Sequence, residues 1–274
     1  EYYKSKIKGV GVKNENSELN IQEFIGERKN KYIPGSSIKG ALRTAFIYSY
    51  FLDNEDRYKI KKIKNEAQIM EAEILSAEKE DKNKNTTGLE PKKDPFKTVK
   101  VSDTEKINLE DFTVNKLKIK EGTLICEALK GIYTEDTNDF FLNEKKGINF
   151  NIVSTEYILK NNNKMNYKNK LGIKELINSL DDKMENILDF EIKKERKNEK
   201  YKIKEFYEKL KEKIEKIKNQ DSNISLIRIG KYTGFNDKTI NLVSTSPTKQ
   251  SRDVLDGNEY PMGWALIKVE EVKV

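Results

Sequence analysis

YIPGSSIKGALRTAF, residues 32–46, joins a rigid turn to the start of a helix. Pro34 fixes φ and Gly35 permits backbone conformations that other residues avoid, so the pair predicts a tight turn. Apolar residues then recur at helical spacing, which predicts a helix over residues 37–52 with one buried face. Gly40 on this helix indicates close approach to a sheet.

The start of this predicted helix also carries groups that suit phosphate. Ser36 or Ser37 can cap the helix, and Lys39 and Arg43, four residues apart, share one face near its N-terminus. Backbone N–H groups, the positive end of the helix dipole and two cations together favour an anion. The same residues suit packing alone, so the sequence leaves both readings open.

The composition restricts the class of protein. The longest apolar stretch, residues 41–52, is interrupted by Arg43, so we expect a buried helix there and no membrane contact. Cys126 is the only cysteine, which excludes an intrachain disulfide framework and a cysteine-clustered zinc site. It lies in an apolar run and is expected in the core. We predict a protein of the reducing cytoplasm.

The formal net charge is +7. This charge suits a polyanionic partner, although a general excess of lysine gives the same total. Arginine is scarcer, and its planar guanidinium suits phosphates and base edges. Three of the six arginines lie in or beside segments marked by glycine or proline: Arg43, Arg228 and Arg252.

Histidine is absent from the chain. Its absence removes the usual general base at neutral pH and the commonest ligand of transition metals. We therefore predict no catalytic residue, no metal and no cofactor, while magnesium held by carboxylates and a mechanism based on lysine and tyrosine stay open as alternatives. Asp94 and Asp103, nine residues apart, are more typical of turn and cap residues than of a metal pair.

The predicted elements are both helices and strands. Helical spacing predicts helices over residues 21–27, 37–52, 56–79, 171–188 and 201–218. Residues 79–93 lack apolar periodicity and are predicted to be a mobile loop. Strands are predicted over residues 98–103, 112–122, 122–133, 147–155, 226–229 and 264–272. This mixture predicts an α+β fold with helices over one face of an antiparallel sheet.

A second segment marked by glycine is LIRIGKYTGFNDKT, residues 226–239. It combines cations, glycines and aromatic residues: Arg228, Lys231, Lys238, Gly230, Gly234, Tyr232 and Phe235. Glycines let a backbone approach phosphates, cations neutralise them, and exposed aromatic rings stack on bases. The segment therefore suits single-stranded RNA. A tight β-turn with its aromatic residues in the core explains the pattern equally well.

Two further segments carry weaker signals. STSPTKQSRD, residues 244–253, brings Lys249 and Arg252 together on a loop with proline. PMGWALIKVE, residues 261–270, contains Trp264 at the head of an apolar strand. A tryptophan at this position is more typical of a core anchor than of a base-stacking residue.

Four motifs together resemble the RAMP superfamily of CRISPR-associated proteins: IPGSSIKGALRTA at 33–45, DPFKTVKVSD at 94–103, RIGKYTGFNDKT at 228–239 and PMGWALIKVE at 261–270. Within this superfamily, the order and spacing of the four motifs are most similar to those of the family that forms the fifth subunit of type III-A Csm effector complexes. The resemblance implies a ferredoxin-like, RRM-related core with an added helical region. It also implies a subunit that binds the 3′ part of the CRISPR RNA and supports its maturation and antiviral defence.

The resemblance carries over to named positions. It places an RNA-contacting turn at Gly35, Ser36, Ser37, Lys39 and Arg43, and a glycine-rich loop at Arg228, Gly230, Lys231, Gly234 and Lys238. With the flanking candidates from the residue patterns, Tyr232, Lys249 and Arg252, these are the predicted RNA-binding residues. Implied partners are CRISPR RNA, target RNA, other Csm RAMP subunits and recruited host nucleases.

The resemblance also suggests a division of the chain. Residues 1–155 are expected to form the RAMP core, without a recognisable first strand before Tyr32, which suggests a missing N-terminal piece. Residues 156–222 form a helical region, and residues 223–274 supply the glycine-rich loop and last strand. The leading hypothesis is a non-catalytic RNA-binding subunit. Its alternatives are a metal-dependent endoribonuclease that cleaves target RNA and a subunit that contacts only neighbouring proteins.

Overall fold

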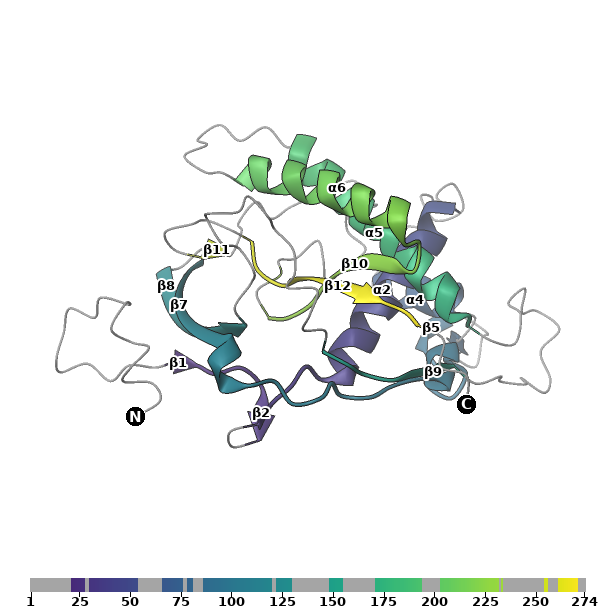
Figure 1. Cartoon of the computed structure of the whole chain (residues 1–274). Helices are drawn as coiled ribbons and strands as arrows, with labels where there is room; N and C mark the ends of the chain where they lie inside the picture. The colour runs from purple at the N-terminus through teal and green to yellow at the C-terminus, as the bar shows by residue number, and fades with distance from the viewer. Residues whose placement is uncertain are drawn as a thin grey trace.

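The computed structural model describes residues 21–27, 30–53, 66–75, 78–80, 86–119, 122–129, 148–154, 171–193, 203–231, 233, 254–255 and 261–270 (Figure 1). The helices are α2 (Gly35–Asp53), α4 (Glu66–Ile74), α5 (Ile173–Lys193) and α6 (Ile203–Gln220), with short 3-10 helices η1 (Pro95–Thr98) and η2 (Leu109–Asp111). The strands are β1 (Ile21–Gln22), β2 (Gly26–Glu27), β3 (Asn30–Lys31), β4 (Glu78–Glu80), β5 (Thr86–Leu89), β6 (Val99–Val101), β7 (Phe112–Ile119), β8 (Gly122–Leu129), β9 (Ile152–Ser154), β10 (Ile224–Arg228), β11 (Val254–Leu255) and β12 (Trp264–Lys268).

The described strands form one four-stranded sheet, in the order β1-β8-β7-β11, and four two-stranded pairs. These pairs are β2–β3, β4–β5, β6–β9 and β10–β12, and all of them are antiparallel. In the larger sheet β7 pairs antiparallel with β8 and with β11, whereas β1 runs parallel to β8. The α+β fold with antiparallel sheets is confirmed. The prediction of a single antiparallel sheet is only partly correct, because the described strands divide among several sheets.

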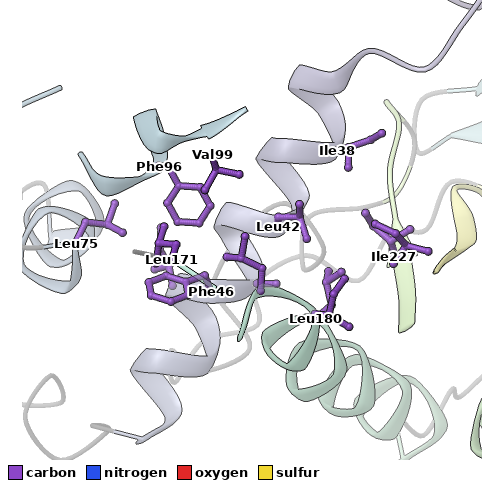
Figure 2. Close-up of a cluster of buried hydrophobic side chains, with 14 of the residues drawn as sticks. Ile38, Leu42, Phe46, Leu75, Phe96, Val99, Leu171, Leu180 and Ile227 are labelled. Atoms are coloured by element: carbon purple, nitrogen blue, oxygen red, sulfur yellow. The ribbon is translucent and has the colours of Figure 1, made fainter. Parts of the chain in front are cut away.

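A first core joins α2, α4, α5, η1 and the strands β6, β10 and β12. Leu42 and Phe46 of α2 are buried here beside Leu180 of α5 and Phe96 of η1 (Figure 2). The Phe46 and Phe96 rings meet edge to face, with centroids 5.7 Å apart. Ile38, Leu42, Ala45 and Phe46 are all buried, at the spacing of one helix face, so the predicted apolar face is confirmed. Burial widens to the neighbouring Ile47, Tyr48 and Phe51 toward the end of the helix.

A second core lies between α5, α6 and the other face of the β10–β12 ribbon. Leu226 points into this core, while the next residue, Ile227, points into the first core. Trp264 and Ile267 of β12 divide in the same way, as the two-residue period of a strand requires. The ribbon is therefore covered on both faces, with α5 and α6 on one side of it in Figure 1.

Residues 21–27 contain strands β1 and β2, so the helix predicted there is wrong. Gln22 pairs with Cys126 of β8, and the Phe24 N–H donates to the Glu127 carboxylate at 3.0 Å. Glu127 also forms a buried ion pair with Lys31 at 2.9 Å. These partners are distant in sequence, so the local apolar spacing could not reveal them.

Two other predicted elements differ from the structure. Residues 79–93, predicted as a mobile loop, contain part of the antiparallel pair β4–β5, and Leu89 packs against the first core. Of the helix predicted over residues 56–79, α4 accounts for 66–74, and 54–65 lie outside the described residues. The division at residues 156 and 223 stays a prediction, although α5 shares the first core with α2.

Candidate nucleic-acid interface

The helix α2 begins at Gly35 and is capped from a distant part of the chain. The Ser37 and Ile38 N–H groups donate to the Pro34 carbonyl, at 2.9 and 3.3 Å, which starts the helical hydrogen bonds. The Gly35 N–H donates to Asp103 Oδ1 at 2.8 Å. The prediction that a serine caps this helix is therefore wrong.

Gly35 is required by close packing. A Cβ atom at this position would lie 2.3 Å from the Val101 carbonyl oxygen and 2.5 Å from that of Ser102. Gly35 is buried, so its role in the structure is to let α2 approach the end of β6. At Gly40 a Cβ would meet nothing within 4 Å, so the close approach predicted there occurs at Gly35 instead.

Arg43 links three elements inside the protein. Its guanidinium forms ion pairs with Glu71 of α4 at 2.8 Å and with Asp94 before η1 at 2.6 Å. It also lies over the Phe96 ring, 5.3 Å from the centroid. Arg43 is one of the predicted RNA-binding residues, on the same helix face as Lys39. The structure corrects this, because two carboxylates and a ring hold the guanidinium against the first core.

The two acids of the DPFKTVKVSD motif are both cap residues, as the sequence predicts. Asp94 Oδ1 accepts the Phe96 N–H at 2.8 Å and caps η1, while Asp103 caps α2. Within the described part of the chain, no group of three or more acidic or cysteine side chains is arranged to hold a metal ion.

Three predicted residues of the α2 turn keep surface accessible to solvent. Ser36 and Ser37 are exposed in the first turn, and Lys39 is half-buried one turn on. Ile38 points into the first core between them. The polar surface of this turn therefore consists of two hydroxyls and one ammonium group, next to a helix start.

Arg228 is held inside the β10–β12 ribbon. Arg228 is only 5% exposed. Its Nε donates to the Met262 carbonyl at 2.9 Å, and its guanidinium lies 4.9 Å from the centroid of the Trp264 ring. These contacts explain why arginine is present at the end of β10, and they correct the expectation that its guanidinium faces a partner. Trp264 packs against the second core, as predicted.

The chain turns outward directly after β10. Gly230 has a φ of +114°, which favours glycine, and both Gly230 and Lys231 are exposed. Lys231 Nζ donates to Gln22 Oε1 of β1 at 3.0 Å. The other candidates of this loop and the next, Tyr232, Gly234, Lys238, Lys249 and Arg252, lie outside the described residues.

The first turn of α2 and the start of the loop after β10 adjoin the same core. Ile38 belongs to the first core and Ile229 packs against it, as does Ile33 before the helix. Each lysine therefore lies close in sequence to a residue that packs in the first core: Lys39 follows Ile38, and Lys231 comes two residues after Ile229. Among the predicted site residues, Ser36, Ser37, Gly230 and Lys231 are exposed and Lys39 is half-buried.

Gln22 is the residue that sequence reasoning missed. It lies 209 residues before Lys231, so no local pattern could reveal the contact. Gly263 is a second residue that the sequence analysis did not single out. A Cβ at Gly263 would lie 2.3 Å from Thr233 Cγ2, which places the turn at Gly263 against the loop.

Cys126 and Tyr48, two residue types that can act as nucleophiles, both have a raised pKa. Burial raises the pKa of the Cys126 thiol, which is 2% exposed and therefore stays protonated, in keeping with its predicted place in the core. Burial, with the neighbouring Asp182 carboxylate, raises the pKa of Tyr48 to about 12. Neither residue shows the lowered pKa of a nucleophile.

A model of the RAMP superfamily matches residues 9–235 of the sequence. The chain belongs to the RAMP superfamily. It is 30% identical over 244 residues to a protein of Methanocaldococcus jannaschii described as "CRISPR system Cms protein Csm5". That match covers 82% of this RAMP chain and 50% of the relative, so the chain spans about half the length of the curated relative that it matches.

The RAMP chain is also similar to solved structures. It matches a chain of the "Cryo-EM structure of Csm-crRNA-target RNA ternary complex in type III-A CRISPR-Cas system" with a TM-score of 0.64 and 18% identity, over 92% of this chain and 76% of the other. It matches the "Crystal structure of T.onnurineus Csm5" with a TM-score of 0.56 and 16% identity, over 97% and 82%. At these identities the likeness shows the fold alone. Within the described residues, no helix is long and apolar enough to cross a membrane.

Proposed function

We propose that this chain is a non-catalytic RNA-binding subunit of a type III-A Csm effector ribonucleoprotein. It binds the 3′ part of the CRISPR RNA through the phosphate backbone, supports maturation of that RNA and serves antiviral defence. Its partners are CRISPR RNA, target RNA and other Csm subunits, with nucleases recruited from the host. Support comes from membership of the RAMP superfamily and from similarity to Csm5 and to a chain of a Csm complex with RNA.

The observation that carries the proposal is that Ser36, Ser37, Gly230 and Lys231 are exposed, and Lys39 half-buried, on two segments that pack against the first core. We propose that these residues form one RNA-binding surface. Hydroxyls and ammonium groups bind phosphate oxygens without reading bases. A contact of this kind is independent of sequence, which suits a subunit that must hold guides of any sequence. Tyr232, Gly234, Lys238, Lys249 and Arg252 remain proposed extensions of the same surface.

The geometry also bears on the endoribonuclease alternative. Asp94 and Asp103, the acids considered for a metal pair, each accept a backbone N–H at the start of a helix. A carboxylate with this structural role gives the alternative no support, so the proposal contains no catalytic step. Magnesium-dependent cleavage of RNA that disappears with Asp94→Asn or Asp103→Asn, while the fold is kept, would contradict it.

The experiment is a titration of labelled single-stranded RNA at several salt concentrations. We expect Lys39→Ala with Lys231→Ala to weaken binding and to reduce the slope of log affinity against log salt by about 1.4, because each lost phosphate contact on a single strand contributes about 0.7. The matched control, Lys204→Ala with Lys216→Ala, removes the same charge from exposed positions on α6. Equal affinities for wild type and the Lys39 and Lys231 variant would disprove the proposal. Equal losses of affinity in this variant and in the control would show that RNA binding depends on net charge alone, which would also contradict the proposal.

A further inference from the structure

The loop after β10 is tightly folded around a buried threonine. Thr233 is 2% exposed, and its Oγ1 donates to the Gly230 carbonyl at 3.3 Å. Lys231, between them in the sequence, is exposed. The same short segment therefore turns one side chain into the protein and presents an ammonium group on the surface.

The turn before β12 lies against this loop. The Ile229 N–H donates to the Gly263 carbonyl at 2.9 Å, and Arg228 Nε donates to the neighbouring Met262 carbonyl. Gly263 has a φ of +89°, and a Cβ there would lie 2.3 Å from Thr233 Cγ2 and 2.5 Å from the Ile229 carbonyl oxygen. The missing side chain at Gly263 thus leaves the space that the Thr233 methyl group occupies.

A second support comes from the four-stranded sheet. Gln22 of β1 accepts a hydrogen bond from Lys231 Nζ at 3.0 Å, and β1 is itself paired with β8 through Gln22 and Cys126. The amide of Gln22 is neutral, so this bond orients the ammonium group without cancelling its charge.

From these contacts we infer that Gln22 and Gly263 are positioning residues, which hold Lys231 in place for an RNA phosphate. The inference rests on the proposed function and deepens it. Neither residue needs to touch RNA: Gly263 fixes the loop backbone by leaving room for Thr233, and Gln22 fixes the end of the Lys231 side chain. A lysine held in this way loses less conformational freedom when it binds, so the contact is stronger than that of a mobile lysine.

The test is a double-mutant cycle on RNA affinity, using the whole chain and the labelled single-stranded RNA. We expect Gln22→Ala to weaken binding about three- to tenfold, the range that ordering one long side chain implies, and to leave the salt slope unchanged. In the Lys231→Ala background, Gln22→Ala has no further effect. Gln220→Ala, at an exposed glutamine on α6, is the matched control and leaves affinity unchanged.

Gly263→Ala tests the other support. It weakens RNA binding and speeds amide hydrogen exchange at Ile229 and Lys231, whereas Gly172→Ala, where a Cβ meets only ordinary contacts from 3.8 Å, changes neither. Additive losses for Gln22 and Lys231, or full affinity in both the Gln22 and Gly263 variants, overturn the inference. If Lys39→Ala with Lys231→Ala has no effect on affinity, the proposed function itself is wrong. If that variant weakens binding but the Gln22 and Gly263 variants do not, only this inference is wrong.

Discussion

Asp103 Oδ1 accepts a hydrogen bond from the Gly35 N–H at 2.8 Å, although 68 residues separate the two. The neighbouring residues add a reciprocal pair, in which the Ile33 N–H donates to Thr104 Oγ1 and the Thr104 N–H donates to the Ile33 carbonyl. A carboxylate of the chain itself therefore occupies the anion position at the start of α2. A phosphate at this turn would meet Ser36, Ser37 and Lys39 instead of the Gly35 N–H.

Asp103→Ala should destabilise the protein by about 1 kcal/mol, the usual cost of removing a helix cap. The loss follows because the Gly35 N–H lies at a buried residue and has its partner in Asp103. Urea unfolding measures the change. Asp53→Ala is the control, since Asp53 is exposed at the other end of the same helix, where a negative charge opposes the dipole. An equal loss in both variants would show that the cap adds nothing.

Gly35→Ala and Gly40→Ala should have opposite effects, although both glycines lie on α2. At Gly35 the new methyl group would meet backbone oxygens at 2.3 and 2.5 Å, so we expect a loss of about 1–3 kcal/mol, typical of overpacking. At Gly40 the methyl group has open space, and alanine favours a helix over glycine by roughly 0.5–1 kcal/mol. Thermal unfolding of the two variants distinguishes them, and a stable Gly35→Ala protein would contradict the close approach.

The sequence predicted the parts of the fold that depend on local patterns. The helices α2, α5 and α6 and the strands of the β7–β8 hairpin have apolar spacing strong enough to identify each element alone. Residues 21–27 failed because β1 has only two residues and is fixed by Cys126 and Glu127 of β8. No pattern within seven residues contains that information.

The candidate site was predicted as a set of segments, but not in its side-chain roles. Glycine and proline correctly marked the turns, since backbone geometry is a local property. The arginines were misread, because a guanidinium that suits phosphate also suits carboxylates, carbonyls and aromatic rings. Arg43 meets Glu71 and Asp94, and Arg228 meets Met262 and Trp264, and only the tertiary fold could decide between these partners and RNA.

Arg43→Ala should therefore lower stability without changing RNA affinity. Removing the guanidinium leaves Glu71 and Asp94 without this partner in a partly buried setting, so we expect a loss of about 1–3 kcal/mol. Arg43→Lys retains the charge but lacks the planar guanidinium that contacts both carboxylates, so it should recover only part of the lost stability. Urea unfolding and the RNA titration are both needed. A drop in affinity with unchanged stability would return Arg43 to the RNA-binding surface.

Tyr48 provides a prediction about alkaline pH. Burial and the Asp182 carboxylate raise its pKa to about 12 in the folded protein, from an ordinary value of 10.0. The unfolded chain therefore releases the phenolic proton at lower pH than the folded protein does. The contribution of Tyr48 to stability is complete below about pH 10 and is lost as the pH rises from about 10 to about 12.

Tyr48→Phe removes this ionisation and keeps the buried ring. The variant should lose less stability than wild type between those two pH values, as measured by urea unfolding at a series of pH values. Absorbance titration of the folded proteins should show one phenol fewer ionising near pH 12 in the variant. Parallel curves for the two proteins across this range would show that Tyr48 ionises as an ordinary tyrosine, and would contradict its burial beside Asp182.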